Sequence, residues 1–212
     1  MKAVRAPIPW LAWLLPALVI ALAFAQEVVT ITDAQIERLT QSFGQTARTR
    51  LTQWRTIMTD QRYRAATERQ KLELVNDFMN LTPFKSDREH WGKEDYWATP
   101  IEFLSTNGGD CEDFTIARYF TLRELGVAPQ KLRLTYVKAR IGGPASTVTQ
   151  AHMVLAYYAD PAAEPLILDN LIGTIRPASQ RSDLQPVFSF NADGIWVGGG
   201  PSPNSSVDRL TR

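Results

Sequence analysis

The spacing of apolar residues changes once along this chain, and the change limits the folds that it can adopt. Apolar residues recur at helical spacing in the first part, as in Leu72, Val75 and Met79. In the second part, beginning at Leu132, they alternate or run together over short stretches, as they do in strands. Helices that precede the strands, instead of alternating with them, predict an α+β fold with an antiparallel sheet.

Local signals place three helices in the first part of the chain. Thr32 can cap a helix that starts directly after it, and Gly44 interrupts that helix. A second helix is expected over residues 46–58. A third is expected over residues 66–81, where Pro83 ends it because the residue before a proline is pushed out of the helical region.

Between the third helix and Leu132 the chain first has an aromatic stretch, residues 84–109, which is interpreted as rich in loops. A helix is expected over residues 111–125, with Gly126 in the position of a C-cap glycine. The expected strands start at residue 132 and include 152–158, 165–171, 187–190 and 195–197, the last two joined by a turn at 191–194.

The first residues have the features of an export signal. Lys2 and Arg5 precede an apolar run over residues 10–24, and small residues stand at its end. Pro16 interrupts this run, which is short for a bilayer span, so we favour export over an uncleaved membrane anchor. Cleavage is predicted after Ala25, which places the mature protein in the periplasm.

The chain is therefore divided into a signal peptide (1–25), an N-terminal helical part (26–83), a core that carries the chemistry (84–197) and a flexible tail (198–212). The 212 residues carry a net charge of +1, and Lys and Arg are scattered. A general nucleic-acid binder would show a basic face or stripe, so nucleic acid is excluded as an expected partner.

Cys111 is the only cysteine, so an exported chain of this sequence has no intramolecular disulfide. Such a thiol is either buried and inert or retained for its reactivity, and its count alone does not decide. Its surroundings favour reactivity. Cys111 follows a pair of glycines at the predicted start of a helix, where unpaired N–H groups and the helix dipole favour a thiolate.

His152 and Asp169 are candidates for the base and the group that orients it. His152 is expected at the start of one strand and Asp169 at the end of the next. In neighbouring antiparallel strands these two positions lie side by side, which a nucleophile–base–orienter set requires. Asn170 can also orient an imidazole, but adjacent strand residues face opposite sides of a sheet, so only one of the two serves.

Three acidic residues, Asp110, Glu112 and Asp113, surround the cysteine. They can cap the helix and complement its dipole. Three carboxylates beside a thiol also disfavour its ionisation, and a divalent cation would remove this penalty. Carboxylate oxygens at close spacing suit calcium, so the sequence predicts a calcium site at these three residues.

Several motifs stand out when the core is compared as a whole. They are Gly109-Asp110-Cys111-Glu112-Asp113-Phe114, Leu132-Arg133-Leu134-Thr135-Tyr136-Val137, Ala151-His152-Met153-Val154-Leu155 and Leu168-Asp169-Asn170-Leu171. Together they resemble the bacterial transglutaminase-like cysteine proteases, and among these the LapG type. Residues 176–179 and 188–191 also fit. The resemblance covers roughly residues 91–196, and the helical part matches in character more than in motif.

The resemblance implies a papain/transglutaminase-like fold and calcium-dependent endoproteolysis by Cys111, His152 and Asp169. It implies calcium ligands at Asp110 and Glu112, with Asp113 a further candidate. It also implies a large surface adhesin as substrate, cut near its N-terminus beside paired alanines, so that release promotes biofilm dispersal. The implied partner is an inner-membrane receptor of the LapD type, which responds to cyclic di-GMP and sequesters the protease.

Two other functions are compatible with the same residues. Transglutaminase or amidase chemistry uses the same triad and acyl-thioester with a different acceptor. A non-catalytic binding module would keep the fold with Cys111 merely buried. If the chain is a protease, the Cys111 backbone N–H is a natural oxyanion donor, and residues 96–97 are the candidate region for a second donor.

Overall fold

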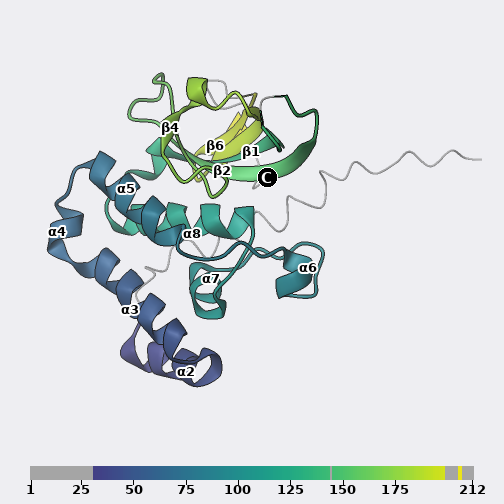
Figure 1. Cartoon of the computed structure of the whole chain (residues 1–212). Coiled ribbons are helices and arrows are strands. Elements are labelled where there is room, and N and C mark those ends of the chain that lie inside the picture. Colours follow the sequence, from purple (N-terminus) through teal and green to yellow (C-terminus); the bar gives the residue numbers. More distant parts are fainter. Residues whose placement is uncertain (1–30, 144, 199–204, 207–212) are drawn as a thin grey trace, which may run out of the picture.

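The computed structural model describes residues 31–143, 145–198 and 205–206 (Figure 1). The predicted signal peptide, residues 1–25, lies outside the described residues. The helices are α2 (Asp33–Phe43), α3 (Gln45–Thr59), α4 (Gln61–Arg64), α5 (Glu68–Met79), α6 (Asp87–His90), α7 (Pro100–Thr106) and α8 (Cys111–Glu124), with 3-10 turns η2 (Pro129–Lys131) and η3 (Ala178–Gln180). The strands are β1 (Leu132–Arg140), β2 (Thr149–Tyr157), β3 (Leu166–Leu168), β4 (Arg176–Pro177), β5 (Leu184–Asn191), β6 (Gly194–Val197) and β7 (Ser205–Ser206).

Threonine side chains start three of these helices. Thr32, Thr67 and Thr99 each accept a hydrogen bond from the backbone three residues later, and the side chain there reaches back to the threonine. Gly44, at φ +83°, separates α2 from α3. The predicted cap at Thr32 and break at Gly44 are confirmed. The third helix begins later than predicted because Thr67 caps it.

The stretch of residues 84–109, expected to be rich in loops, also contains two short helices. Ser86 caps the four-residue helix α6, and Thr99 with Pro100 begins α7. A single helical turn has too few apolar residues to show a period, which is why α6 is invisible in the pattern. The Thr99-Pro100 pair, by contrast, is a recognisable helix start.

The strands form one antiparallel sheet in the order β4-β3-β2-β1-β5-β6-β7. In the central pair, Val137 on β1 lies opposite His152 on β2. The predicted α+β class and antiparallel sheet are confirmed. His152 is the fourth residue of its strand, not the first, because the ladder to β1 extends back to Thr149.

Helices cover one face of the sheet, and α8 lies between the sheet and the other helices (Figure 1). One hydrophobic core joins the N-terminal helices to this face; it includes Trp54 and Leu72 from the helices and Leu132 and Met153 from the sheet. The indole N–H of Trp54 donates to Thr121 of α8 at 2.8 Å inside this core. The helical part and the core segment are therefore packed as one body, which fixes the start of α8 against the sheet.

Two residues of the segment predicted as a flexible tail form a short strand. Ser205–Ser206 form β7 and pair with Gly194 and Ile195 of β6, because the edge of β6 offers unpaired backbone groups. The turn predicted at 191–194 is confirmed, since Asn191 accepts a hydrogen bond from Asp193 there. Residues 199–204 and 207–212 of the tail lie outside the described residues.

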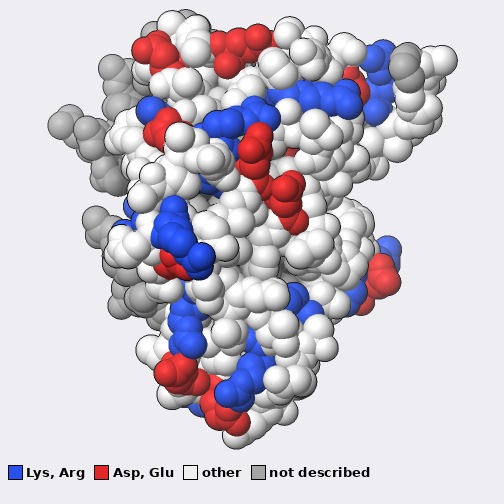
Figure 2. Space-filling model, turned by 60° about the vertical axis from the view of Figure 1, so that its left-hand side comes forward, with Lys and Arg blue, Asp and Glu red and all other residues white. Residues whose placement is uncertain are grey.

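Charges of both signs mix on the surface shown in Figure 2, where Lys and Arg alternate with Asp and Glu over the same face. This mixing fits a chain whose net charge is +1. Among the described residues, no helix has the length and the apolar character needed to cross a bilayer.

Candidate active site

Cys111 is the first residue of α8, and this end of the helix is fastened to β2. The Thr115 hydroxyl, one turn further along, donates to the backbone carbonyl of Met153 at 3.1 Å. The Met153 backbone also hydrogen-bonds to the Cys111 sulfur. The half-buried thiol therefore lies beside the residue that follows His152 in the sequence.

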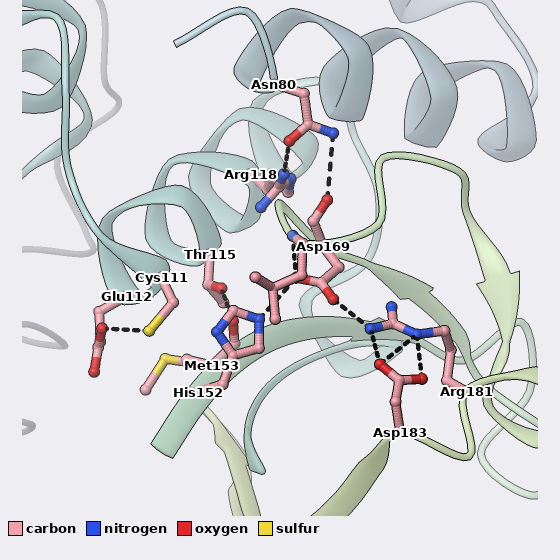
Figure 3. A network of polar contacts seen from close by, with 11 residues as sticks. Asn80, Cys111, Glu112, Thr115, Arg118, His152, Met153, Asp169, Arg181 and Asp183 are labelled. Carbon is pink, nitrogen blue, oxygen red and sulfur yellow. Dashed lines mark hydrogen bonds and ion pairs between the residues drawn. The ribbon is translucent and has the colours of Figure 1, made fainter. Parts of the chain in front are cut away.

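His152 and Asp169 form a buried pair. The imidazole Nε2 is 2.8 Å from the Asp169 Oδ1, and both residues are almost fully buried. In Figure 3 the imidazole lies between the Cys111 sulfur and the Asp169 carboxylate. Because Nε2 is engaged by Asp169, Nδ1 is the nitrogen that remains for the thiol. The structure thus brings the three predicted catalytic residues to one place.

Asp169, and not Asn170, contacts His152. Asp169 follows the last residue of β3, and its Oδ1 also accepts the Leu171 backbone N–H at 3.1 Å. The Asn170 side-chain oxygen is buried without a hydrogen-bond partner. Burial by itself raises the pKa of Asp169, but hydrogen bonds and charge from His152 and Arg181 outweigh burial and lower the pKa to about 2. The carboxylate is therefore ionised at neutral pH.

Several acidic groups lie near the thiol, and Figure 3 shows Glu112 on the side of the Cys111 sulfur away from His152. Carboxylate oxygens of Asp87, Asp110 and Asp113 lie within 4.8 Å of one another, and Asp110, Cys111 and Glu112 form an overlapping group. Asp87 comes from α6 and was not predicted, because no local pattern connects it to the segment around Cys111. The other three are the predicted acidic residues.

These acids differ in how their oxygens are used. Asp113 is fully buried and accepts the backbone N–H groups of Ala98 at 2.7 Å and Asp110 at 3.3 Å. One oxygen of Asp87 accepts the Tyr96 backbone N–H. The other oxygen of Asp87, and Oδ1 of Asp110, are buried without a hydrogen-bond partner. Buried carboxylate oxygens without a hydrogen-bond donor fit a hard cation such as calcium, which takes oxygen ligands.

Burial and the charge of Glu112 raise the pKa of Asp110 to about 9, and burial raises that of Asp113 to about 7. The Cys111 sulfur donates to Glu112 Oε2 at 2.8 Å. Burial first, and the Glu112 charge second, raise the pKa of the Cys111 thiol. The acids therefore suppress the thiolate when no positive charge accompanies them.

Residues 96–97 were expected to supply a second oxyanion donor, but two of their N–H groups already donate hydrogen bonds within the chain. The Tyr96 N–H is taken by Asp87, and the Trp97 indole N–H donates to Asp95 at 3.0 Å. The Cys111 backbone N–H, in the first turn of α8, keeps the position expected of an oxyanion donor.

Two further residues that contact Asp169 were not predicted from the sequence. Arg181 contacts Asp169 from the segment before β5, and Asn80, at the end of α5, donates to the Asp169 backbone carbonyl at 3.3 Å. Neither residue has a local signal that links it to His152, since each reaches Asp169 only through the folded chain.

The site combines an antiparallel sheet, a helix that begins with a cysteine, and a buried pair of a histidine on β2 and an aspartate directly after β3. These features define the class of transglutaminase-like proteins. Within this class, the chain belongs to the bacterial transglutaminase-like cysteine proteinase family BTLCP, whose family model matches residues 43–184. The resemblance predicted from the motifs is confirmed, and the protein is a cysteine protease by family.

Solved structures similar to this chain agree with that assignment. Legionella pneumophila LapG is 42% identical over 80% of this chain and 90% of its own, with a TM-score of 0.67. Its calcium-bound form is 39% identical over 85% of this chain and 98% of its own, and its EGTA-treated form 40% identical over 85% and 92%; the TM-score is 0.70 for both. No curated protein sequence matches the chain.

Proposed function

We propose that this chain is a calcium-dependent cysteine endopeptidase with Cys111 as nucleophile, His152 as base and Asp169 as the residue that orients it. The observation that carries the proposal is the buried 2.8 Å contact between His152 Nε2 and Asp169 Oδ1. The residue after His152, Met153, hydrogen-bonds through its backbone to the sulfur of Cys111, the only cysteine of the chain. A merely structural histidine would not need a buried carboxylate on one nitrogen and a thiol beside the other.

The geometry supports the following sequence of steps. Asp169 holds Nε2, so Nδ1 of His152 accepts the Cys111 proton, and the thiolate attacks the peptide carbonyl. The Cys111 backbone N–H stabilises the oxyanion. His152 gives its proton to the departing amine as the C–N bond breaks, which leaves an acyl-thioester. Water, deprotonated by His152, then hydrolyses the thioester and restores the thiol.

Calcium fits the acidic cluster beside the thiol. Asp87 and Asp110 would hold the ion through their buried oxygens without hydrogen-bond partners, and Glu112 lies next to them. Asp113 would contribute less, because both of its oxygens already accept backbone N–H groups. When bound, calcium supplies the positive charge that offsets these carboxylates and so favours the thiolate. The existence of calcium-bound and EGTA-treated forms of Legionella pneumophila LapG supports this part.

The substrate and the cellular setting are proposed from the motif resemblance. The substrate is a large surface adhesin, cut near its N-terminus beside paired alanines, so that its release promotes biofilm dispersal. The enzyme acts in the periplasm after removal of residues 1–25. A LapD-type inner-membrane receptor for cyclic di-GMP sequesters it.

Incubation of the purified mature chain with the N-terminal part of a co-encoded adhesin tests the proposal. We expect cleavage in calcium, none in chelator, and none with Cys111→Ala. Mass spectrometry of the products locates the cut. Incorporation of an added amine in preference to water would show transglutaminase chemistry instead. A folded wild-type protein that cuts no peptide in calcium, and whose thiol resists alkylation at neutral pH, would support a non-catalytic module.

A further inference from the structure

Asp169 is held by more than His152. Its Oδ1 contacts the His152 imidazole and accepts a hydrogen bond from the Leu171 N–H. Its Oδ2 accepts a hydrogen bond from Nη2 of the Arg181 guanidinium at 2.6 Å (Figure 3). The side chains of Asp169 and Arg181 are 0% and 1% exposed, so water does not compete for this ion pair. Each oxygen of the carboxylate thus has its own partner, and rotation of the carboxylate would break both sets of contacts.

Arg181 is itself fixed in place. Its Nε donates to Asp183 Oδ1 at 3.0 Å and its Nη2 to Asp183 Oδ2 at 2.8 Å, which is the two-point geometry that a guanidinium makes with a carboxylate. Its backbone N–H donates to the backbone carbonyl of Ala178, the first residue of η3. The planar guanidinium is therefore presented to Asp169 in one orientation.

A second buried arginine near Asp169 acts differently. Arg118 of α8 donates to the Asn80 side chain at 2.6 Å, and Asn80 donates to the backbone carbonyl of Asp169. This chain of contacts fixes the backbone of Asp169 and leaves the carboxylate oxygens to His152 and Arg181. Of the two arginines, only Arg181 touches the carboxylate that orients the imidazole.

We propose that Arg181, supported by Asp183, is a positioning residue for the protease reaction: by holding Oδ2 of Asp169 it directs Oδ1 at Nε2 of His152 and so sets the angle of the imidazole toward Cys111. This inference rests on the proposed function, since it assigns a role within the same triad. Arg181 touches neither substrate nor thiol and acts only through Asp169 and His152. A misplaced base lowers the rate of proton transfer while substrate binding is retained.

The first test compares Arg181→Met and Arg181→Lys with Arg176→Met, a matched control because Arg176 is an exposed arginine of the neighbouring strand β4. On an adhesin-derived peptide in saturating calcium, we expect Arg181→Met to lower kcat about a hundredfold with little change in KM. Arg181→Lys restores the charge without the two-point geometry, so it should recover part of the loss. The control should keep wild-type kinetics.

The dependence of kcat on pH is a second readout, which would not change in Arg181→Met if Arg181 had only a structural role. The charged groups around the Asp169 carboxylate are His152 on β2, Arg118 on α8, and Arg181 and Asp183 in the segment before β5. Without Arg181, only His152 and the Leu171 N–H remain as direct contacts that oppose the effect of burial on Asp169, so its carboxylate takes up a proton at higher pH. The acid limb of kcat should therefore move to higher pH in Arg181→Met.

The third readout needs no substrate. The imidazole N–H that faces Asp169 gives a downfield proton resonance in NMR, and the chain has only one other histidine, so His90→Gln assigns it. We expect this resonance to be sharp in the wild type, to be lost or exchange-broadened in Arg181→Met, and to be partly retained in Arg181→Lys.

Folding of each variant is checked by circular dichroism and thermal unfolding. A folded Arg181→Met with wild-type kcat and an unchanged resonance would overturn the proposal. If Arg181→Met does not fold, Asp183→Asn and Arg181→Lys replace it, and wild-type behaviour of both variants would overturn the proposal equally. If the wild type cuts no peptide, the proposed function fails while the resonance still tests whether Arg181 orients His152.

Discussion

Asp169 and Asp110 lie on opposite sides of the same proposed reaction centre, and their pKa values are shifted in opposite directions, to about 2 and to about 9. Burial by itself raises the pKa of both carboxyl groups, although Asp169 is almost fully buried and Asp110 is half-buried. Asp169 has Arg181 and His152 as partners, whereas Asp110 has Glu112 and other acids as its charged neighbours. The side with His152 is therefore complete within the chain, while the side with Asp110 is electrostatically balanced only when it binds a cation.

The largest losses of activity are expected from substitutions of Cys111, His152 and Asp169. Cys111→Ala should abolish cleavage, and His152→Ala should lower kcat by about a thousandfold or more, because it removes the proton acceptor. Asp169→Ala should lose far more rate than Asn170→Ala. Kinetics on a peptide substrate measure this ranking, with thermal unfolding as a check on the fold. A greater loss in Asn170→Ala at equal stability would contradict the assignment of Asp169.

The next largest effects are expected on the acidic side. Chelation should stop proteolysis, and added calcium should restore it. Asp110→Ala and Asp87→Ala should lower calcium affinity at least about tenfold, measured by isothermal titration. Asp77→Ala is a suitable control, because Asp77 belongs to α5 and lies outside both acidic groups. Absence of heat together with full activity in chelator would leave the acids as helix caps.

A smaller effect is expected in the pH dependence of stability, which has opposite signs for Asp110 and Asp169. In chelator, the raised pKa values of Asp110 and Asp113 mean that these groups bind protons more tightly in the folded chain. Stability that they contribute is present at low pH and lost as pH rises through about 7 and 9. Asp169 has the opposite sign: its contribution is present above its unfolded pKa of about 4 and lost as pH falls toward 2.

We therefore expect Asp110→Asn to raise the Tm of the calcium-free protein at pH 8. Because Asp110 is partly exposed, the gain is discounted to about 1 kcal/mol, or about 2–4 °C for a chain of this size. In calcium the same variant should be less stable than the wild type, since it loses the stabilisation that binding gives. An unchanged Tm in chelator at both pH 5 and pH 8 would show that Asp110 is not held under electrostatic strain.

The smallest effect is expected at the contact that joins the two sides. Thr115→Val removes the hydrogen bond from α8 to the Met153 carbonyl, which is buried, and should cost about 1 kcal/mol of stability. The loss of kcat should be less than about tenfold, because the helix stays packed in the core. Thr115→Ser keeps the hydroxyl and is the control. Denaturant unfolding monitored by tryptophan fluorescence measures the difference.

Signals within a few residues were sufficient to predict the helix ends and the strands that short segments determine. Thr32 and Gly44 mark helix ends by chemistry within a few residues, and the apolar alternation from Leu132 places a strand. The predicted trio of Cys111, His152 and Asp169 came from the starts and ends of such elements, and the fold brings these residues together. Strand alternation indicated only that one of Asp169 and Asn170 can serve, and the folded structure shows that Asp169 contacts His152.

Other features depended on the tertiary structure, because their partners are distant in sequence and carry no mutual pattern. Asp87 joins the acidic cluster only because the segment from α6 to α7 folds against the start of α8, where Ala98 donates to Asp113. Arg181 reaches Asp169 only once β3, β4 and the segment before β5 are in place. The sequence by itself determined which groups can react. Tertiary packing decided which of them are paired, buried or left in need of a cation, because desolvation and charge pairing depend on what surrounds a group in space and not along the chain.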